Sequence, residues 1–550
     1  MSTKTTTPYY VIGDGPKTIE FFPDRQQLIK TTLKELGLSD VVPSTFPVVT
    51  SVTDGAVDRL DPTTGKPLAK VPVASWPQID TAIKLTVEAQ SRWKELTGNQ
   101  RVEILTAVGE ALKSKMGPLS KMLSIEIGKI PTEGEGEITE VLDVLKLIQE
   151  RAAEVGGNKK FRVIEYPSGE EERRQLGWVR HLSLKPLGLV LKNPAFNFPA
   201  AVFGWGALPA LAAGNGVFLK PHEDASLTSL AMIKIISNAL NPFGFGHLVS
   251  VAVTDRENGR RMWEDPRFKL VEATGSEQMG REVAKVVAPS FRRSTLELGG
   301  NNAVIIDKGT DINQAVEILL FNCAGTAGQR CTTARRIFIH KDVYDEFCEK
   351  FIRAYKTLLH IGDPLQPGVN VGPVFHHRTV KLYTEALEHF TKSGSKLLVG
   401  GRHITGNFVE PTVMEAPSLN FEASYEERFV PIVNLFRYSD ADWASGKVIA
   451  EVNNPGYGLA GGVFTKSDSM WDQCVSEIRV GILNRNYGSS GAEAVGYFGG
   501  EGRTGNGRML GTKPDNGAMF SHYVYPTESV IAKPGKIVHA QGVNFSSSKD

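Results

Sequence analysis

One part of the sequence repeats an order of segments that few architectures can accommodate. Short apolar segments alternate with helical patterns, and Gly or Pro residues separate many of them. The predicted strands span residues 216–220, 248–253 and 269–274, and the predicted helices span residues 226–240 and 277–288. A second alternating run begins at residues 302–306 and continues to about residue 463. Parallel strands need crossover connections, so the sequence predicts an α/β fold whose first half contains a sheet of the dinucleotide-binding type.

Composition excludes several classes of protein. The chain has 550 residues, enough for about two to four domains. Its 62 Lys and Arg residues nearly balance 61 Asp and Glu residues, which gives no electrostatic reason to expect nucleic acid or an anionic membrane as partner. Four cysteines without a CxxC pair argue against a disulfide scaffold and against a cysteine-based zinc site. We therefore expect metal-free chemistry in a reducing compartment.

Two features bear on location. The N-terminus has no apolar segment behind a basic start, and its first arginine is Arg25, so it resembles neither a signal peptide nor a transit peptide. Residues 193–219 carry no charge and could span a bilayer by length. Several Pro and Gly residues interrupt this segment, which favours a buried core segment. We expect a soluble, cytoplasmic protein.

A cysteine on a predicted tight loop is the strongest candidate for chemistry. An apolar helical face runs into residues 325–333, where two glycines interrupt the helix. Cys331 is therefore predicted on or just after a loop, next to Arg330, and helical residues could follow it. A nearby cation or helix N-terminus favours the nucleophilic thiolate, although a buried structural role stays open. The other cysteines lie in helical patterns and are expected to be structural: Cys323, Cys348 and Cys474.

Two polar residues in apolar surroundings are further candidates. Glu297 ends an apolar strand and precedes two glycines, and burial could raise its pKa enough for it to act as a general base on water. Asn197 lies between two aromatic residues, where a neutral amide could donate to an oxyanion. Each also has an ordinary reading, as a paired glutamate or as a turn asparagine. The GxGxxG match at residues 500–505 lacks a preceding strand and a following helix, so it is interpreted as a loop.

Together with other short motifs, these three residues resemble the aldehyde dehydrogenase superfamily over residues 59–511. The motifs include Phe196-Asn197-Phe-Pro, Leu219-Lys220-Pro, Thr274-Gly-Ser276, Leu296-Glu297-Leu-Gly-Gly, Gly328-Gln-Arg-Cys331 and Glu427-Arg-Phe429. The resemblance implies a Rossmann-type cofactor domain, an α/β catalytic domain and a small β oligomerisation arm. It assigns residues 51–157 and 188–297 to NAD binding, 298–494 to catalysis, 158–187 and 515–540 to oligomerisation, and leaves 1–50 as an N-terminal arm. A homodimer or homotetramer is expected.

The resemblance also implies roles for single residues. Cys331 attacks an aldehyde, Asn197 and the Cys331 backbone stabilise the oxyanion, and Glu297 activates the water that releases the acid. The NAD contacts carried over from the family are Lys220, Glu223, Gly275, Ser276, Glu427 and Phe429. Glu223 is expected to accept from a ribose hydroxyl and to repel the 2′-phosphate of NADP.

A finer resemblance points to the antiquitin branch, which oxidises α-aminoadipic semialdehyde. It rests on segments 195–205, 297–302, 325–336 and 490–493. The branch holds the amino-acid end of its substrate at positions that correspond here to Glu126, Arg330, Gly491 and Ala492. The chain departs from the branch pattern at Val430, after Gly511 and in its first fifty residues, which leaves substrate and assembly open.

Four alternatives remain at this stage. The chain could act on another semialdehyde or on aldehydes in general. It could transfer the acyl group to CoA, although that class usually lacks a glutamate like Glu297. It could be a thioesterase or esterase that uses Cys331, or a non-catalytic descendant of the fold. The joint presence of Cys331, Glu297 and Asn197 favours aldehyde oxidation.

Overall fold

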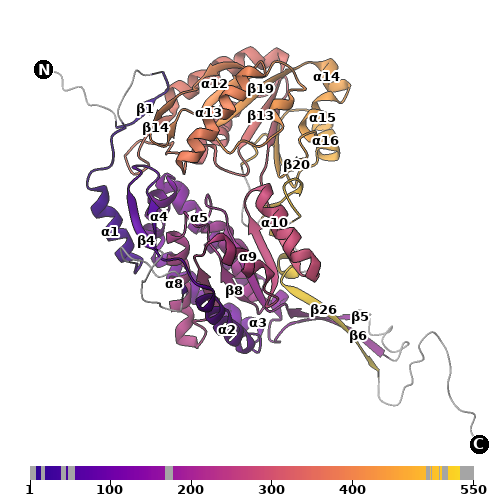
Figure 1. Ribbon diagram of the computed structural model, residues 1–550. Helices are drawn as coiled ribbons and strands as arrows, with labels where there is room; N and C mark the ends of the chain where they lie inside the picture. The colour runs from indigo at the N-terminus through magenta and orange to yellow at the C-terminus, as the bar shows by residue number, and fades with distance from the viewer. Residues whose placement is uncertain are drawn as a thin grey trace, which may run out of the picture.

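The computed structural model describes residues 8–13, 19–38, 45–46, 56–166, 178–490, 496, 498–506, 508–510 and 518–532. Within these ranges the chain forms two large sheets, each covered by helices, and a small antiparallel arm (Figure 1). The predicted α/β class is confirmed.

The first sheet has the strand order β11-β10-β7-β8-β9-β2. Its members are β2 (Thr45–Phe46), β7 (Leu189–Asn193), β8 (Gly216–Leu219), β9 (Val249–Ala252), β10 (Phe268–Thr274) and β11 (Arg293–Glu297). Strands β7 to β11 run parallel, and β2 joins the edge antiparallel. Both faces are covered, which explains why these strands are nearly continuous apolar runs. The three strands predicted from the sequence here are confirmed.

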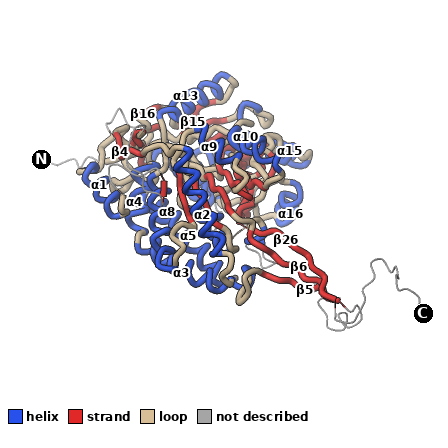
Figure 2. The backbone as a smooth tube through the Cα atoms, turned by 60° about the horizontal axis from the view of Figure 1, so that its bottom comes forward, coloured by secondary structure: helices blue, strands red, loops and turns tan. Residues whose placement is uncertain are grey.

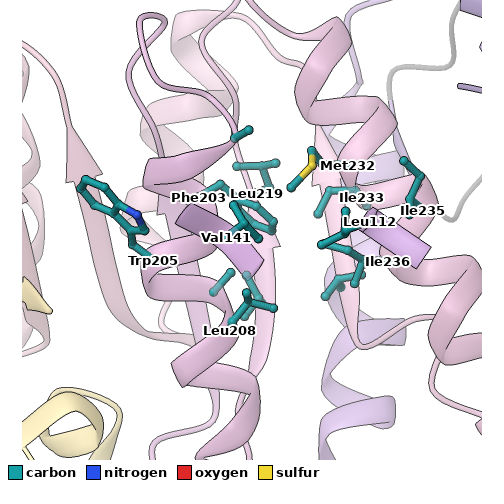
Figure 3. Packing of buried hydrophobic residues seen from close by; sticks show 14 of the residues in the cluster. Leu112, Val141, Phe203, Trp205, Leu208, Leu219, Met232, Ile233, Ile235 and Ile236 are labelled. Atoms are coloured by element: carbon teal, nitrogen blue, oxygen red, sulfur yellow. The ribbon is translucent and has the colours of Figure 1, made fainter. Parts of the chain in front are cut away.

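Helices pack on both sides of this sheet. They are α2 (Trp76–Trp93), α3 (Gly98–Ser114), α4 (Met116–Ile127), α5 (Pro131–Glu150), α7 (Ala201–Ala212), α8 (Leu227–Leu240), α9 (Arg256–Glu264) and α10 (Glu277–Val287). Every residue of α7 is buried. Figure 3 shows Phe203 and Leu208 of this helix packed near Val141 of α5 and Leu219 of β8. The uncharged segment 193–219 is therefore buried core, as predicted.

The second sheet has the order β15-β18-β19-β13-β12-β21-β22. Its strands are β12 (Asn302–Ile306), β13 (Ala334–His340), β15 (Lys396–Val399), β18 (Thr412–Glu415), β19 (Ile432–Tyr438), β21 (Ala460–Phe464) and β22 (Ile482–Arg485). All pair in parallel except β15, which is antiparallel to β18. Its helices are α11 (Ile312–Ala324), α12 (Lys341–Leu358), α13 (His377–Lys392), α14 (Asp440–Ala444), α15 (Lys447–Asn453) and α16 (Asp468–Glu477). Cys323, Cys348 and Cys474 lie in α11, α12 and α16, as predicted.

Two segments far apart in the sequence form the arm. Strands β5 (Arg162–Tyr166), β6 (Trp178–Pro186) and β26 (Val524–Ala532) pair antiparallel in the order β26-β6-β5. Figures 1 and 2 show this ribbon projecting from the body of the molecule. The sequence raised this pairing as a possibility. Completion of the arm by a second subunit stays a prediction.

The described parts of the N-terminal segment lie across both sheets' domains. Helix α1 (Arg25–Glu35) packs on α4, and β1 (Tyr10–Val11) pairs with β14 (His360–Ile361). Arg25 is 5% exposed and forms ion pairs of 2.7 Å with Asp61 and with Asp363, both fully buried. The segment therefore ties the end of β3 (Val57–Leu60) to residues after β14.

Several short elements complete the chain: β3 (Val57–Leu60), β4 (Pro67–Val71), β16 (His403–Thr405), β17 (Phe408–Val409), β20 (Tyr457–Gly458), β23 (Phe498–Gly499), β24 (Glu501–Gly502), β25 (Arg508–Leu510) and α17 (Ala518–Ser521). Residues 500–505 form β24 and a turn rather than a helix start, which confirms the loop interpretation of the GxGxxG match. Among the described residues, no helix combines the length and apolar character needed to cross a membrane.

Candidate active site

The carboxyl edge of the first sheet faces a cavity of about 160 Å³. Strands β10 and β11 end at this edge, and the loop before β13 closes it from the second domain. The lining residues are Glu140, Phe198, Val202, Trp205, Thr274, Glu297, Leu298, Arg330, Cys331, Thr332, Leu459, Ser490 and Phe498. Ligands of open parallel sheets bind at this edge, so the cavity is the candidate active site.

The loop that carries Cys331 has an unusual backbone. Helix α11 ends at Ala324, and the next turn places Thr326, Ala327 and Gly328 at φ angles of 52°, 51° and 68°. Left-handed conformations cost energy for residues other than glycine, and they cluster at functional sites. A Cβ on Gly328 would lie 2.5 Å from the Cα of Pro431, so this position requires glycine. The loop prediction is confirmed, but β13 and not a helix follows Cys331.

Hydrogen bonds fix the backbone of Cys331. The Asn302 side chain donates from Nδ2 to the carbonyls of Cys331 and Thr333, at 2.7 and 2.9 Å. Gly300 permits this approach, because a Cβ there would lie 2.4 Å from the Cys331 oxygen. The Ser489 hydroxyl donates to the carbonyl of Thr332 at 2.7 Å. These contacts hold the thiol at the cavity wall, and the sequence analysis did not identify Asn302 or Ser489.

The electrostatic environment of Cys331 differs from the expectation. Burial, with repulsion from Glu427 and Glu297, raises the pKa of the Cys331 thiol to about 12, and Arg330 only partly opposes this. Burial also raises the pKa of Cys323 to about 12. The expected easy ionisation beside Arg330 is therefore wrong for the protein alone. What distinguishes Cys331 is its place in the cavity, since Cys323 is 3% exposed inside the second core.

Asn197 and Glu297 reach the same site from the first sheet. Asn197 follows β7 and donates from Nδ2 to the Gln329 carbonyl at 2.8 Å, which places its amide beside the Cys331 loop. Its second N–H remains for another acceptor. Glu297 is the last residue of β11, is 2% exposed and lines the cavity with its registered neighbour Thr274. The structure thus brings together the three residues predicted to be catalytic.

The predicted cofactor residues surround the adjoining edge of the sheet. Lys220 follows β8, and its side chain packs against Gly259 of α9. A Cβ on Gly259 would lie 2.5 Å from Lys220 Cε. Burial lowers the pKa of Lys220, and the charge of Glu223 opposes this lowering, which indicates that the two side chains are close. Gly275 and Ser276 precede α10, whose first turn is capped by the Ser276 hydroxyl accepting from Met279 N.

Glu427 and Phe429 approach this edge from the second domain. Glu427 Oε1 accepts from Gly300 N at 3.1 Å and lies 3.5 Å from Arg335 Nη2, and burial raises its pKa. A Cβ on Gly299 would lie 1.8 Å from Glu427 Oε2, which explains the first glycine after Glu297-Leu298. Phe429 lies 6.0 Å from Phe196, ring centre to ring centre.

The structure corrects part of the predicted substrate site. Glu126 is fully buried and does not line the cavity. Its two oxygens accept from Leu227 N at 2.5 Å and from Thr228 N and Oγ1 at 2.8 and 2.7 Å, so it caps the start of α8. The substrate-binding prediction for Glu126 is therefore wrong. Gly491 and Ala492 lie outside the described residues, although the preceding Ser490 lines the cavity.

Arg330 does line the cavity, but it has partners. Its Nη2 donates to Glu133 Oε1 at 2.5 Å, and its Nε donates to the Thr326 hydroxyl at 2.9 Å. The guanidinium also lies over the rings of Phe198 and Phe321. These contacts fix its orientation at the wall, and among the described residues Nη1 makes no hydrogen bond.

Glu140 of α5 is a cavity carboxylate that the sequence analysis missed. Burial and the nearby Glu137 raise its pKa to about 7, against attraction from Lys129 and Arg330. Glu133, Glu137 and Glu140 have the spacing i, i+4, i+7 and therefore share one helix face. Three carboxylates on the face of a helix that also carries buried apolar residues were the available signal.

Comparison with known proteins agrees with this geometry. The model of the aldehyde dehydrogenase family matches residues 49–519. This chain belongs to the aldehyde dehydrogenase family. Aldehyde dehydrogenase family 7 member B4 of Arabidopsis thaliana is 34% identical over 89% of this chain and 93% of its own length. The α-aminoadipic semialdehyde dehydrogenase of Bos taurus is 33% identical over 93% and 92%. An NADP-dependent enzyme of E. coli has a similar structure, with a TM-score of 0.78, 28% identity, and coverage of 87% and 95%.

Membership in this family identifies the protein as an oxidoreductase and an aldehyde dehydrogenase, as the motifs predicted. The relatives also support the resemblance to the branch that contains α-aminoadipic semialdehyde dehydrogenase. The roles of individual site residues, the choice between NAD and NADP, and the aldehyde itself stay predictions.

Proposed function

We propose that this aldehyde dehydrogenase oxidises a semialdehyde to a carboxylate with NAD, through a covalent adduct on Cys331. The observation that carries the proposal is the joint presence of Cys331 and Glu297 in one cavity. A nucleophile and a general base at the same cavity are the groups that covalent acyl chemistry followed by hydrolysis requires.

The chemistry begins at the thiol. The Cys331 sulfur attacks the aldehyde carbon, and the carbonyl oxygen becomes an oxyanion. The second N–H of Asn197 and the backbone N–H of Cys331 are the donors for this oxyanion. Because the Cys331 pKa is about 12 in the protein alone, a proton acceptor is needed. Of the two cavity carboxylates, Glu140 and Glu297, we assign this role to Glu297, because its charge acts on the Cys331 thiol.

The residues around the sheet edge fit a dinucleotide. Gly275 and Ser276 leave the start of α10 accessible to phosphate oxygens, Lys220 and Glu223 suit a ribose, and Glu427 is held by Gly300 N near Cys331. The bound cofactor supplies a hydride acceptor. After oxidation, Cys331 carries a thioester, Glu297 removes a proton from water, the water oxygen attacks the carbonyl, and the thiolate leaves with release of the acid.

The walls of the cavity favour a substrate with an amino-acid end, and we propose α-aminoadipic semialdehyde. Glu140 replaces Glu126 as the carboxylate for the ammonium group, since its Oε2 is buried without a hydrogen-bond partner in the described part of the chain. Arg330 offers Nη1 to the substrate carboxylate. An aldehyde without this end would make no contact with Arg330 Nη1 and would leave the Glu140 carboxylate without a cation, which lowers kcat/KM.

One set of assays tests the proposal. NADH formation is measured with α-aminoadipic semialdehyde, hexanal and betaine aldehyde, each with and without CoA, in wild type, Glu140→Gln and Cys331→Ala. We expect the semialdehyde to give the highest kcat/KM, no dependence on CoA, and loss of that preference in Glu140→Gln. A preference for hexanal or betaine aldehyde would refute the substrate, and a requirement for CoA would refute hydrolysis by Glu297.

A further inference from the structure

A buried group of three ionisable residues lies directly behind the cavity. Lys192 of β7 donates to Glu272 of β10, Nζ to Oε2, at 2.6 Å, and the Tyr523 hydroxyl donates to the other carboxylate oxygen at 2.8 Å. Lys192, Glu272 and Tyr523 are 1%, 2% and 0% exposed. Interior strands of a parallel sheet are normally apolar, and a buried ion pair adds little stability compared with packed apolar residues. Stability alone therefore does not explain the group.

Strand register places this group beneath the general base. Strand β10 lies between β7 and β11. Its Glu272 is opposite Lys192 of β7, and its Thr274 is opposite Glu297 of β11. Glu272 and Thr274 are two residues apart and share one face of the sheet, at a spacing of about 7 Å. Thr274 and Glu297 both line the cavity. Glu272 is thus the next residue on this face of β10 behind the cavity wall formed by Thr274 and Glu297.

Helix α7 gives the same placement independently. Val202 lines the cavity, and Gly206 is one turn further along the same helix face, about 6 Å away. A Cβ on Gly206 would lie 2.0 Å from Lys192 Nζ and 2.6 Å from Glu272 Oε2. Only glycine leaves room for the ion pair at this position. Both elements therefore show that the group adjoins the cavity.

The opposite side of the group reaches toward solvent. His522 precedes Tyr523 and is only partly buried. Burial and the charge of Arg293 lower the pKa of His522, whereas the charge of Glu272 raises it. His522 therefore lies within electrostatic range of Glu272 and Arg293. Burial and Glu272 raise the pKa of Tyr523 well above its ordinary value, which keeps its hydroxyl protonated as a donor.

We propose that Glu272, held by Lys192 and Tyr523, carries the proton released at Glu297 away from the cavity toward His522 and solvent. The inference rests on the proposed function, in which each turnover releases protons inside the cavity. In hydrolysis, a water O–H bond breaks, its oxygen bonds to the thioester carbon, and the C–S bond breaks. Glu297 takes the proton, which moves through the Thr274 hydroxyl or one water to Glu272 and then to His522. Glu297 is then ready for the next turnover.

Hydrolysis of p-nitrophenyl acetate tests this without a cofactor. The ester acylates Cys331 with release of p-nitrophenolate, and turnover then depends on hydrolysis of the acetyl thioester. In Tyr523→Phe and Glu272→Gln we expect an unchanged burst, a hydrolysis rate lowered about tenfold, and a larger solvent deuterium isotope effect on that rate. His522→Ala should show a smaller loss that added imidazole restores.

Tyr383→Phe is the matched control. Tyr383 is also buried, its hydroxyl donates to the Glu410 carbonyl at 2.7 Å, and it lies in the second domain away from the cavity. This variant should lose similar stability and keep the wild-type hydrolysis rate and isotope effect. If Glu272→Gln does not fold, Tyr523→Phe decides.

The outcomes separate the two proposals. Release of p-nitrophenolate by Cys331→Ala at the wild-type rate would refute Cys331 as nucleophile and with it the proposed function. A normal burst with wild-type hydrolysis and isotope effect in Tyr523→Phe would refute only the proton path and leave the group as an anchor for the C-terminal segment. Slower hydrolysis in Tyr523→Phe with an unchanged isotope effect would also refute it.

Discussion

The raised pKa of Glu140 predicts a stability that changes with pH. The replacement Glu140→Gln keeps the shape of the side chain and removes its charge. The carboxylate ionises at an ordinary value of 4.5 in the unfolded chain and at about 7 in the folded protein. Its contribution to stability is therefore fully present below about pH 4.5 and is lost as pH rises through about 7. The wild type carries a penalty at high pH that the glutamine variant lacks.

The size of the penalty follows from the same values. The difference between 4.5 and about 7 corresponds to about 3 kcal/mol, at about 1.4 kcal/mol per pH unit. Glu140 is only partly buried, so solvent screening reduces this, and we expect about 1–2 kcal/mol. Thermal unfolding midpoints of both proteins are compared at about pH 5 and about pH 8.5. In a chain of 550 residues, 1 kcal/mol shifts the unfolding midpoint by about 1 °C, so Glu140→Gln should gain about 1–2 °C over wild type at the higher pH and less at the lower one.

An exposed glutamate on the same helix supplies the control. Glu135→Gln removes a charge from α5 without changing the cavity, and its difference from wild type should not vary with pH. If Glu140→Gln differs from wild type equally at both pH values, burial does not disfavour the Glu140 carboxylate. If Glu135→Gln shows the same trend, the effect is a general one of net charge.

Three other replacements test the site. Cys331→Ala should lower the rate of NADH formation by several orders of magnitude, while Cys323→Ala keeps the wild-type rate. NAD should still quench tryptophan fluorescence in both variants. Substantial turnover in Cys331→Ala would refute the role of Cys331. Glu223→Ser should reduce the preference for NAD over NADP by about tenfold in kcat/KM, and an unchanged ratio would show that Glu223 does not select the cofactor. Gly300→Ala should cost about 1–3 kcal/mol and lower activity by displacing the Cys331 carbonyl. Gly117→Ala should keep wild-type activity, because no atom lies near its Cβ position and its backbone is not left-handed. Equal activity in both variants would show that the approach of Gly300 to Cys331 is not needed.

Local patterns were sufficient for much of the fold. The strands at the carboxyl edge were visible because parallel strands buried on both faces are continuous apolar runs. The break after α11 was visible because glycines mark a change of backbone conformation. These signals involve neighbours in the sequence, so they also located Cys331, Glu297 and Asn197, each of which follows or ends such an element.

The errors concern contacts between distant segments. Glu126 and Glu140 are both helical glutamates, and only tertiary packing distinguishes their roles. Because α4 packs against α8, Glu126 caps α8, and because α5 packs beside the Cys331 loop, Glu140 lines the cavity. The Cys331 pKa likewise depends on Glu427, which comes from a loop almost one hundred residues later, and on the depth of the cavity. Arg330 is next to Cys331 in the sequence and lowers the thiol pKa, but burial, Glu427 and Glu297 outweigh it.

Helix α5 explains why these distant contacts act together. Its three carboxylates lie on one face, and each addresses a different part of the site. Glu133 fixes Arg330, and Glu137 pairs with Lys129 at 2.6 Å while also accepting from Ala200 N and Ala201 N at the start of α7. Glu140, about one turn after Glu137, lines the cavity. Because a helix moves as a rigid unit over one or two turns, a shift of α5 would move the Arg330 anchor, the start of α7 and the cavity carboxylate together. The polar wall of the cavity is therefore set by the packing of one helix, and substitutions at the buried Val141 or Ile138 should alter substrate preference without contacting the substrate.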